Sequence, residues 1–251
     1  MTPDPPTPPA ETQDRLSRTL RIFQHARGHR ATSDDVLLAA MAAHAAPRAR
    51  RILDLGTGKG TVALLLARAL PHSQLIGLEA EPSSHALAVR NAALNDLAHR
   101  YTPLLGDLRD PQALLGHAPF DLICGAPPYM PLGTGPLPSD PQRAAGRFEL
   151  RGGVEAYAQT AATHLAPAGT IVLLMDGRGT DRLTRALAAA GHPITALVTV
   201  VPRPGEAPTF QIGIADGQPP RPAAVLAMRG ATGEAWSAEY TALRTALDLD
   251  G

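Results

Sequence analysis

The fold is decided by the stretch RILDLGTGKG, residues 51–60, which joins an apolar run to three closely spaced glycines. Ile52, Leu53 and Leu55 predict the end of a buried parallel strand, and the glycines predict a tight turn out of it. A second apolar run, which ends at Leu70, predicts a helix directly after the turn. Because the first amides of a helix lack intrahelical partners and carry partial positive charge, this turn suits a carboxylate or a phosphate.

Acidic or unusual residues follow the neighbouring predicted strands as well. Asp54 lies just before the glycine turn, and Glu79 ends the next strand. A carboxylate at that second strand end can accept hydrogen bonds from both ribose hydroxyls of a nucleoside. Asp107 follows the third strand, and the sequence GAPPY, residues 125–129, follows the fourth. Since ligands of such sheets bind beyond the carboxyl ends of the strands, these features together predict a nucleoside site.

Strands and helices alternate along most of the chain. This alternation predicts an α/β fold with a Rossmann-like, doubly wound and mostly parallel sheet of seven strands, joined by right-handed crossovers. The expected strands lie at 52–55, 75–79, 102–105, 120–124, 170–175, 194–201 and 209–215, with one more short strand at 223–228. The expected helices lie at 36–45, 61–70, 82–95, 154–165 and 178–190, and a last one begins at about residue 237.

Three regions are expected along the chain. Residues 1–14 form a disordered tail rich in proline and threonine, 15–50 form an N-terminal extension with a cap helix, and 51–251 form the main domain. Ser33 and the two aspartates after it are expected to cap the helix of the extension, because a serine oxygen can accept a hydrogen bond from a free amide. The segment 130–151, dense in proline and glycine, is expected to be a long irregular loop.

The composition limits the classes of function that this chain can have. The 251 residues include 23 Lys+Arg and 23 Asp+Glu, so the formal net charge is zero and any contact with nucleic acid needs a local basic patch. The single cysteine, Cys124, excludes an intramolecular disulfide and fits a reducing compartment. Without a leader-like or long apolar segment, a cytoplasmic protein is expected. The nine histidines lack metal-ligand spacing, so no metal site is expected.

The spacing of the glycines separates two classes of nucleoside cofactor. A dinucleotide-binding turn usually reads Gly-x-Gly-x-x-Gly, whereas this chain has Asp-x-Gly-x-Gly-x-Gly, with Thr61 at the place of the third glycine. This arrangement resembles the class I S-adenosylmethionine-dependent methyltransferases. The resemblance implies that Asp54 and its neighbours line the methionine end, Glu79 holds the ribose and Asp107 faces the adenine. The implied cofactor-binding residues are Ser33, Asp34, Asp54, Gly56, Thr57, Gly58, Glu79, Ala80, Asp107 and Leu108.

The segment after the fourth strand narrows the resemblance. GAPPY looks like the Asn/Asp-Pro-Pro-Tyr signature of enzymes that methylate planar nitrogens, either adenine amines in nucleic acid or glutamine amides in release factors. It is most similar to the bacterial family that methylates the exocyclic amine of an adenine in a valine tRNA. That family's other patterns resemble RATSDDVLL at 30–38 and MRG at 228–230, leading into YTAL at 240–243. The implied activity is N6-adenine methylation in tRNA, with catalytic positions at Ala126, Pro127, Pro128 and Tyr129.

One residue departs from that signature. In the family pattern, the Asn side chain and the carbonyl of the next proline accept hydrogen bonds from the amine, while the tyrosine stacks on the flipped base. Position 126 is Ala, and loss of one well-placed polar group costs on the order of a hundredfold in rate. Three interpretations stay open: methylation of tRNA adenine, slow or with another acceptor; methylation of a small molecule or a protein amide; or a non-catalytic module that binds S-adenosylmethionine.

Arginines flank the predicted catalytic segment on both sides in sequence. They are candidates for a local basic funnel, although Arg carries nearly all of the positive charge of this chain. The expected substrate-binding residues are Arg30, Tyr129, Arg143 and Arg147. The neutral net charge equally permits a small-molecule or protein substrate.

Overall fold

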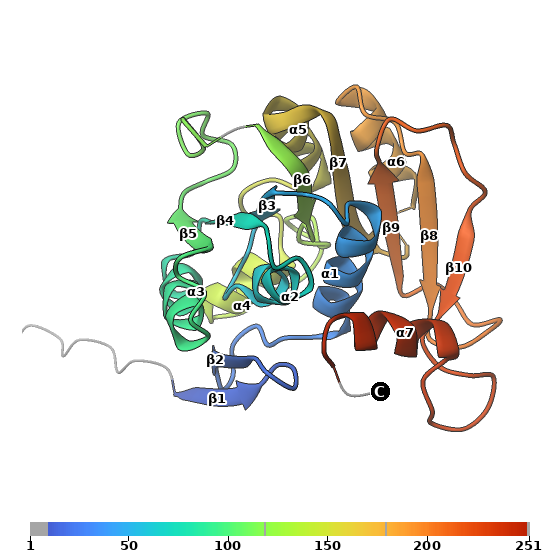
Figure 1. Ribbon diagram of the computed structural model, residues 1–251, viewed down its shortest axis with the longest axis horizontal. Coiled ribbons are helices and arrows are strands. Elements are labelled where there is room, and N and C mark those ends of the chain that lie inside the picture. The colour runs from blue at the N-terminus through green and yellow to red at the C-terminus, as the bar shows by residue number, and fades with distance from the viewer. Residues whose placement is uncertain (1–9, 118, 179, 250–251) are drawn as a thin grey trace, which may run out of the picture.

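A computed structural model describes residues 10–117, 119–178 and 180–249 of the chain (Figure 1). Its strands are β1 (Glu11–Arg15), β2 (Arg21–His25), β3 (Arg51–Leu55), β4 (Gln74–Glu79), β5 (Tyr101–Leu105), β6 (Phe120–Gly125), β7 (Leu165–Asp176), β8 (Ala196–Val201), β9 (Phe210–Ala215) and β10 (Ala224–Ala227). Its helices are α1 (Ser33–Ala45), α2 (Thr61–Ala69), α3 (Pro82–Leu94), α4 (Pro141–Arg147), α5 (Val154–His164), α6 (Thr180–Ala189) and α7 (Ala238–Ala246). None of the described helices is long and apolar enough to cross a membrane.

The central sheet has the order β10-β8-β9-β7-β6-β3-β4-β5 within the described residues. The strands from β5 to β7 are parallel, while β9 runs antiparallel to both β7 and β8. The predicted doubly wound, mostly parallel sheet is therefore confirmed. It holds eight described strands instead of seven, because β10 pairs with the edge of β8 in parallel.

The strand order reverses at β3. From β3 the chain builds outward through β4 to β5, and it then returns to place β6 on the other side of β3. A crevice forms beyond the carboxyl ends of the strands at such a reversal, because the two flanking connections leave in opposite directions. The fold thus places the glycine turn after β3 and the segment GAPPY after β6 at a common opening.

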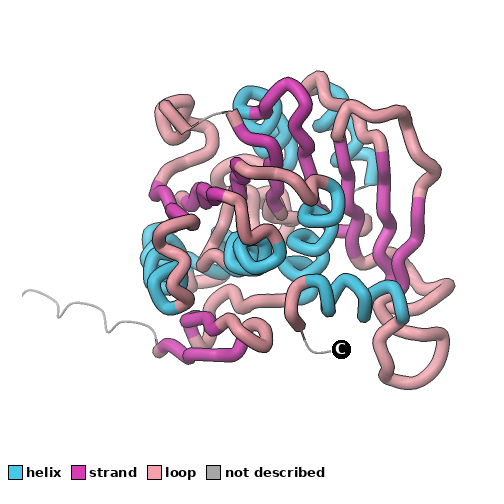
Figure 2. The backbone as a smooth tube through the Cα atoms, in the orientation of Figure 1, coloured by secondary structure: helices cyan, strands magenta, loops and turns pink. Residues whose placement is uncertain are grey.

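Alternate residues of the strands build two separate cores. Ile52 packs with α1 and α2 on one face of the sheet, while Leu53 packs with α5 on the opposite face. The same alternation holds along β7, where Val172 belongs to the first core and Ile171 to the second. Because successive side chains of a strand point to opposite faces, a continuous apolar strand needs helices on both sides. Figure 2 shows the helices distributed around the sheet in this way.

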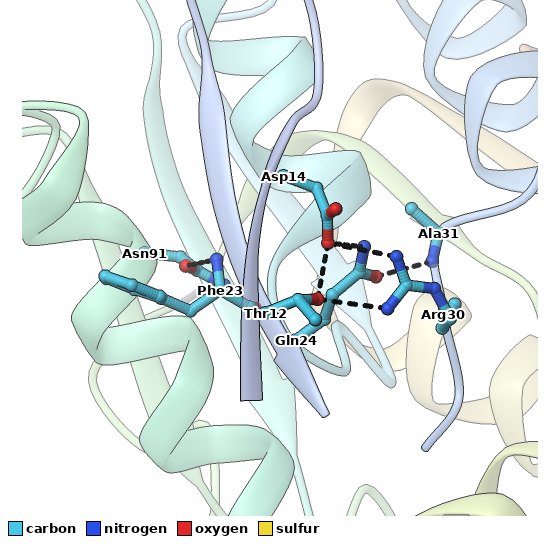
Figure 3. Close-up of polar contacts among 7 residues, drawn as sticks. All are labelled: Thr12, Asp14, Phe23, Gln24, Arg30, Ala31 and Asn91. Atoms are coloured by element: carbon cyan, nitrogen blue, oxygen red, sulfur yellow. Dashed lines mark hydrogen bonds and ion pairs between the residues drawn. The ribbon is translucent and has the colours of Figure 1, made fainter. Parts of the chain in front are cut away.

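The N-terminal extension begins with a hairpin of β1 and β2 outside the central sheet (Figure 1). In Figure 3, the Asp14 carboxylate accepts hydrogen bonds from Gln24 and Arg30, both at 2.9 Å. Phe23 in β2 exchanges backbone hydrogen bonds with the Asn91 side chain of α3, at 2.7 and 3.0 Å. These contacts fix the hairpin against α3 and hold the segment that leads into α1. Strand β1 includes residues 11–14, which the sequence predicts as tail, whereas residues 1–9 lie outside the described residues.

Helix α1 begins earlier than the sequence pattern predicts. Its N-cap is Thr32 and its first helical residue is Ser33, so Ser33 does not cap it. The Asp35 carboxylate accepts a hydrogen bond of 3.0 Å from the backbone amide of Thr32, which satisfies one donor at the helix start. The hydroxyl of Thr32 donates a hydrogen bond to the carboxylate of Asp34.

The segment 130–151 is more regular than expected, because it contains α4. Asp140 caps this helix by accepting a hydrogen bond of 2.8 Å from the Arg143 amide, and Pro141 occupies the first turn. An Asp-Pro pair is a recognised helix start, so this signal was available in the sequence. The buried Gln142 ties α4 to the rest of the fold: it accepts from the His29 amide at 2.9 Å and donates to Ser84 at 3.0 Å. Helix α4 therefore forms a fixed wall beside the crevice.

Candidate cofactor and substrate site

A cavity of about 370 Å³ opens at the carboxyl ends of the parallel strands. Its lining comes from the segments after β3, β4, β5 and β6, from the end of β7, and from the starts of α1 and α2. This is the crevice expected where the strand order reverses. Of the residues predicted from the sequence, those that line it are Asp34, Asp54, Gly56, Thr57, Gly58, Glu79, Ala80, Asp107, Leu108, Ala126, Pro127, Pro128, Tyr129 and Arg147.

Three predicted residues lie elsewhere. Arg30 lines a second, open hollow beside the hairpin and pairs with Asp14 at 2.9 Å. Ser33 and Arg143 are likewise outside the lining of the cavity, as far as the described residues define it. Arg143 is an exposed residue of α4, the helix whose last residue, Arg147, does reach the lining.

The glycine turn is built for close approach of a ligand. Gly56, Gly58 and Gly60 all have positive φ, at 66°, 57° and 89°, a region that residues with a Cβ rarely adopt. A Cβ on Gly56 would lie 2.2 Å from the hydroxyl of Tyr157, so this position is also sterically closed. A Cβ on Gly58 would meet nothing within 4 Å, and Gly58 lines the cavity. The turn therefore leaves open space above Gly58.

Asp54 lies at the floor of the cavity, only 2% exposed. Its carboxylate accepts a hydrogen bond of 2.6 Å from the Thr57 hydroxyl and a longer one of 3.8 Å from the Cys124 thiol. Burial raises the pKa of Asp54 to about 7, because the charged form loses its hydration. A cationic group of a ligand beside Asp54 would favour the ionised carboxylate.

Glu79 connects two of the strand ends. One oxygen accepts a hydrogen bond of 2.8 Å from the Gly58 amide, and the other accepts one of 2.7 Å from the Glu81 amide. Burial raises the pKa of Glu79, while these two amide donors oppose the shift. A carboxylate oxygen has a second lone pair, so both oxygens can still accept from a ligand hydroxyl.

Asp107 lies at the far end of the cavity, after β5. Its carboxylate is held by Arg109, which donates from its backbone amide at 2.9 Å and from its guanidinium at 2.7 and 3.0 Å. These hydrogen bonds lower the pKa of Asp107, so it is ionised at neutral pH.

The segment after β6 forms the opposite end. Tyr129 donates a hydrogen bond of 3.4 Å from its hydroxyl to Asp34, and its ring centroid lies 6.5 Å from that of Phe210. Burial, followed by the charge of Asp34, raises the pKa of the Tyr129 phenol well above its ordinary value, so it stays neutral. Asp176, at the end of β7, also lines the cavity and pairs with Arg178 at 2.7 Å. Ala126 offers no side-chain acceptor, but Asp34 and Asp176 place carboxylates in the same cavity.

Several charged or aromatic lining residues had no predicted role in the site. Among them are His29, Asp35, Lys59, Tyr157, Asp176 and Arg178. Asp176 carries the same signal as Glu79, an acid at a strand end, but the expected strand stopped one residue short of it. Lys59 lies inside the glycine turn and is the only lysine of the chain, which was a usable signal. No group of three or more His, Cys, Asp or Glu side chains in the described part of the chain is arranged to hold a metal ion.

Comparison with known proteins identifies the family. The sequence profile of the methyltransferase small domain matches residues 19–133. A release factor glutamine methyltransferase from Geobacter sulfurreducens is 45% identical over 86 residues, which are 34% of this chain and 28% of that protein. A tRNA1(Val) (adenine(37)-N6)-methyltransferase from Actinobacillus pleuropneumoniae is 30% identical over 178 residues, covering 70% of this chain and 71% of that protein.

Solved structures support the same fold. The crystal structure of a predicted O-methyltransferase from Agrobacterium tumefaciens superposes with a TM-score of 0.67 and 22% identity, covering 86% of this chain and 98% of that chain. At this identity the likeness concerns the fold alone. The chain spans only 28% to 58% of the length of the first relatives in the sequence comparison, so their whole activities do not transfer directly.

The site agrees with this family in its own geometry, since acids at three successive strand ends surround an open glycine turn. The chain belongs to the methyltransferase small domain family and is a class I S-adenosylmethionine-dependent methyltransferase.

Proposed function

We propose that this methyltransferase transfers a methyl group from S-adenosylmethionine to the exocyclic amine of an adenine in tRNA. The observation that carries the proposal is the placement of Tyr129, which stands in the cavity between Asp34 and Phe210 directly after the two prolines. A neutral aromatic side chain at that place can stack on a flipped base. The relative from Actinobacillus pleuropneumoniae is named as a tRNA1(Val) (adenine(37)-N6)-methyltransferase, which agrees with this proposal.

The residues around the glycine turn are proposed to hold the cofactor. Glu79 would accept hydrogen bonds from the ribose hydroxyls, Asp107 would face the adenine, and Asp54 with Gly56 would line the methionine end. Bound S-adenosylmethionine supplies a methyl group on a positively charged sulfur. The chain has to position the amine in line with that group, which is a task of orientation.

The missing acceptor at position 126 can be supplied from two sides. The backbone carbonyl of Pro127 remains, and Asp34 and Asp176 are carboxylates in the same cavity. The charges of both aspartates raise the pKa of the Tyr129 phenol, which supports their closeness to the place where the amine would lie. A carboxylate is a stronger acceptor than an amide, so either can take the hydrogen bond that Asn provides in the family pattern. The proton released from the methylated amine then leaves to that carboxylate or to solvent.

The proposed RNA contact involves the rim formed by α4. Arg147 lines the cavity and Arg143 is exposed on the same helix, so both can reach phosphates beside a target base. Arg30 pairs with Asp14 of the hairpin and lines a second hollow outside the cavity. A cytoplasmic location, where tRNA is available to the enzyme, goes with this proposal.

A second candidate function is methylation of a glutamine amide in a protein. It is favoured by the 45% identity over 86 residues to a release factor glutamine methyltransferase, although the aligned part covers 28% of that protein. An amide nitrogen is planar like an adenine amine, so the same cavity can present either group. A small-molecule acceptor is the remaining alternative.

The acceptor is tested by incubating the protein with isotope-labelled S-adenosylmethionine and three acceptors in parallel: unmodified total tRNA, release factors and a metabolite extract. The proposal expects label in tRNA, recovered as N6-methyladenosine after digestion. Label only in release factors would establish the second candidate, and label only in metabolites would exclude both macromolecules. Binding of S-adenosylhomocysteine without transfer to any of the three acceptors would contradict the proposal.

A further inference from the structure

Lys59 is a buried cation inside the cofactor turn. It lies between Gly58 and Gly60, lines the cavity and is only 4% exposed. Among the described residues, its ammonium forms no ion pair within 4.0 Å. A charge buried without a close partner is costly, and burial accordingly lowers the pKa of Lys59. We therefore expect the buried ammonium of Lys59 to have a specific role.

Acidic residues at the start of α1 act on the ammonium of Lys59. The strongest electrostatic partners of Lys59 are Asp35 and then Asp34, at the start of α1, while Glu79 ranks behind them. Lys59 lies directly after Gly58 in the glycine turn and lines the cavity together with Asp34, Asp35 and Asp54. This is the part of the cavity assigned to the methionine portion of the cofactor.

Apart from the backbone amides of the glycine turn, the acidic side chains of the cavity disfavour a ligand carboxylate. Six acidic residues line the cavity: Asp34, Asp35, Asp54, Glu79, Asp107 and Asp176. The methionine portion of S-adenosylmethionine carries an α-carboxylate, which the ionised carboxylates among them would repel. Of the other cations of the lining, Arg178 is paired with Asp176, Arg147 is exposed at the rim, and the half-buried Arg151 acts on Asp107. Lys59 is the buried cation that can offset the repulsion.

The choice of residue type supports a specific role. The chain has 23 Lys+Arg, and Lys59 is the only lysine among them. A compact ammonium with three donors fits within a tight turn, where a planar guanidinium would need more room.

We propose that Lys59 binds the α-carboxylate of S-adenosylmethionine and so determines that the site takes the complete cofactor. This role concerns the cofactor alone and is independent of the methyl acceptor. The competing interpretation is that Lys59 only neutralises Asp34 and Asp35 and so holds α1 against the glycine turn. The two interpretations differ in whether the ligand carboxylate matters.

The test is a four-part calorimetric cycle. Wild type and Lys59→Met are each titrated with S-adenosylhomocysteine and with its decarboxylated analogue, in the absence of any acceptor. A hydrogen bond between charged groups corresponds to about 10- to 100-fold in affinity, so wild type should bind the complete ligand that much more tightly. In Lys59→Met, the complete ligand should weaken by the same factor while the analogue changes less than about threefold.

Two results would overturn the proposal. One is a wild-type protein that binds both ligands equally, which needs no variant. The other is a Lys59→Met variant that weakens both ligands alike, as expected if Lys59 only holds α1. Lys59→Gln serves as the second variant if Lys59→Met fails to fold, with thermal unfolding as the check. Arg48→Met, an exposed residue before β3, is the matched control and should keep the wild-type preference for the carboxylate.

Discussion

The backbone amide of Gly58 donates a hydrogen bond of 2.8 Å to the carboxylate of Glu79. This single contact joins the glycine turn after β3 to the end of β4. It fixes both halves of the proposed nucleoside site before any ligand arrives. We therefore expect that replacing Glu79 weakens ligand binding and does not only lower the stability of the fold.

Replacing Glu79 tests that dependence. Glu79→Ala removes both of its amide hydrogen bonds and the proposed ribose acceptor, so S-adenosylhomocysteine should bind about 100-fold more weakly or worse by calorimetry. The matched control is Glu81→Ala, which removes the cap of α3 and should lower stability by about 1 kcal/mol. If both variants lose stability but neither loses affinity, Glu79 is a structural residue only.

Two glycines separate backbone strain from ligand access. Gly58 and Gly217 have similar positive φ, 57° and 68°, and a Cβ on either meets nothing within 4 Å. Gly58→Ala and Gly217→Ala should each destabilise the fold by about 1 kcal/mol, as measured by urea unfolding. Only Gly58 lines the cavity, so only Gly58→Ala should weaken S-adenosylhomocysteine binding, by about tenfold or more. Equal affinities would place the ligand elsewhere.

The raised pKa of Asp54 makes the stability of the ligand-free protein depend on pH. Between about pH 4 and the folded pKa of about 7, the folded state keeps a proton that the unfolded chain has released. Increasing pH therefore destabilises the fold through Asp54, by at most about 1.4 kcal/mol per pH unit, and the loss ends above the folded pKa.

Asp54→Asn has no such proton to lose. Its stability relative to wild type should rise as the pH increases from about 4 to 7 and stay constant above that, in urea unfolding of the ligand-free protein. A constant difference over the whole range would show that Asp54 is ionised throughout and that its environment is more polar than described.

Restoring the family acceptor tests the chemistry at the target end. Ala126→Asn should raise the initial rate of tRNA adenine methylation if no other group fully replaces the amide, by up to about a hundredfold. Asp34→Asn and Asp176→Asn in the wild-type background identify which carboxylate accepts the amine hydrogen, since the one in use should lower kcat. A rate unchanged by all three substitutions would remove side-chain acceptors from the mechanism.

The arginines of α4 at the rim of the cavity predict how tRNA binding depends on salt concentration. Arg143→Ala combined with Arg147→Ala should weaken tRNA binding across sequences and reduce the slope of log affinity against log salt by about 1.5 to 2. The control is Arg48→Ala with Arg50→Ala, two exposed arginines before the amino end of β3. Equal effects of the two pairs would show that tRNA does not approach over α4.

The parts of the fold with local signals were predictable from the sequence. The glycine turn and the strand ends at Glu79 and Asp107 follow from short patterns that act on their own neighbours. Helix α4 also had a local signal at Asp140 and Pro141, which the high proline and glycine content obscured.

Features that depend on distant partners were not predictable in the same way. Arg30 pairs with Asp14 of the hairpin, and nothing within either segment specifies this contact. The same holds for β1, whose polar sequence gains its strand conformation by pairing with β2. The burial of Lys59 likewise depends on the folded surroundings of the turn, because the turn alone would leave a lysine exposed.

The most direct measurement is the structure of the protein in complex with S-adenosylhomocysteine. We expect the ribose hydroxyls within hydrogen-bonding distance of Glu79 and the sulfur directed toward Tyr129. A nucleoside bound elsewhere, or a Glu79 carboxylate turned away from it, would contradict the account.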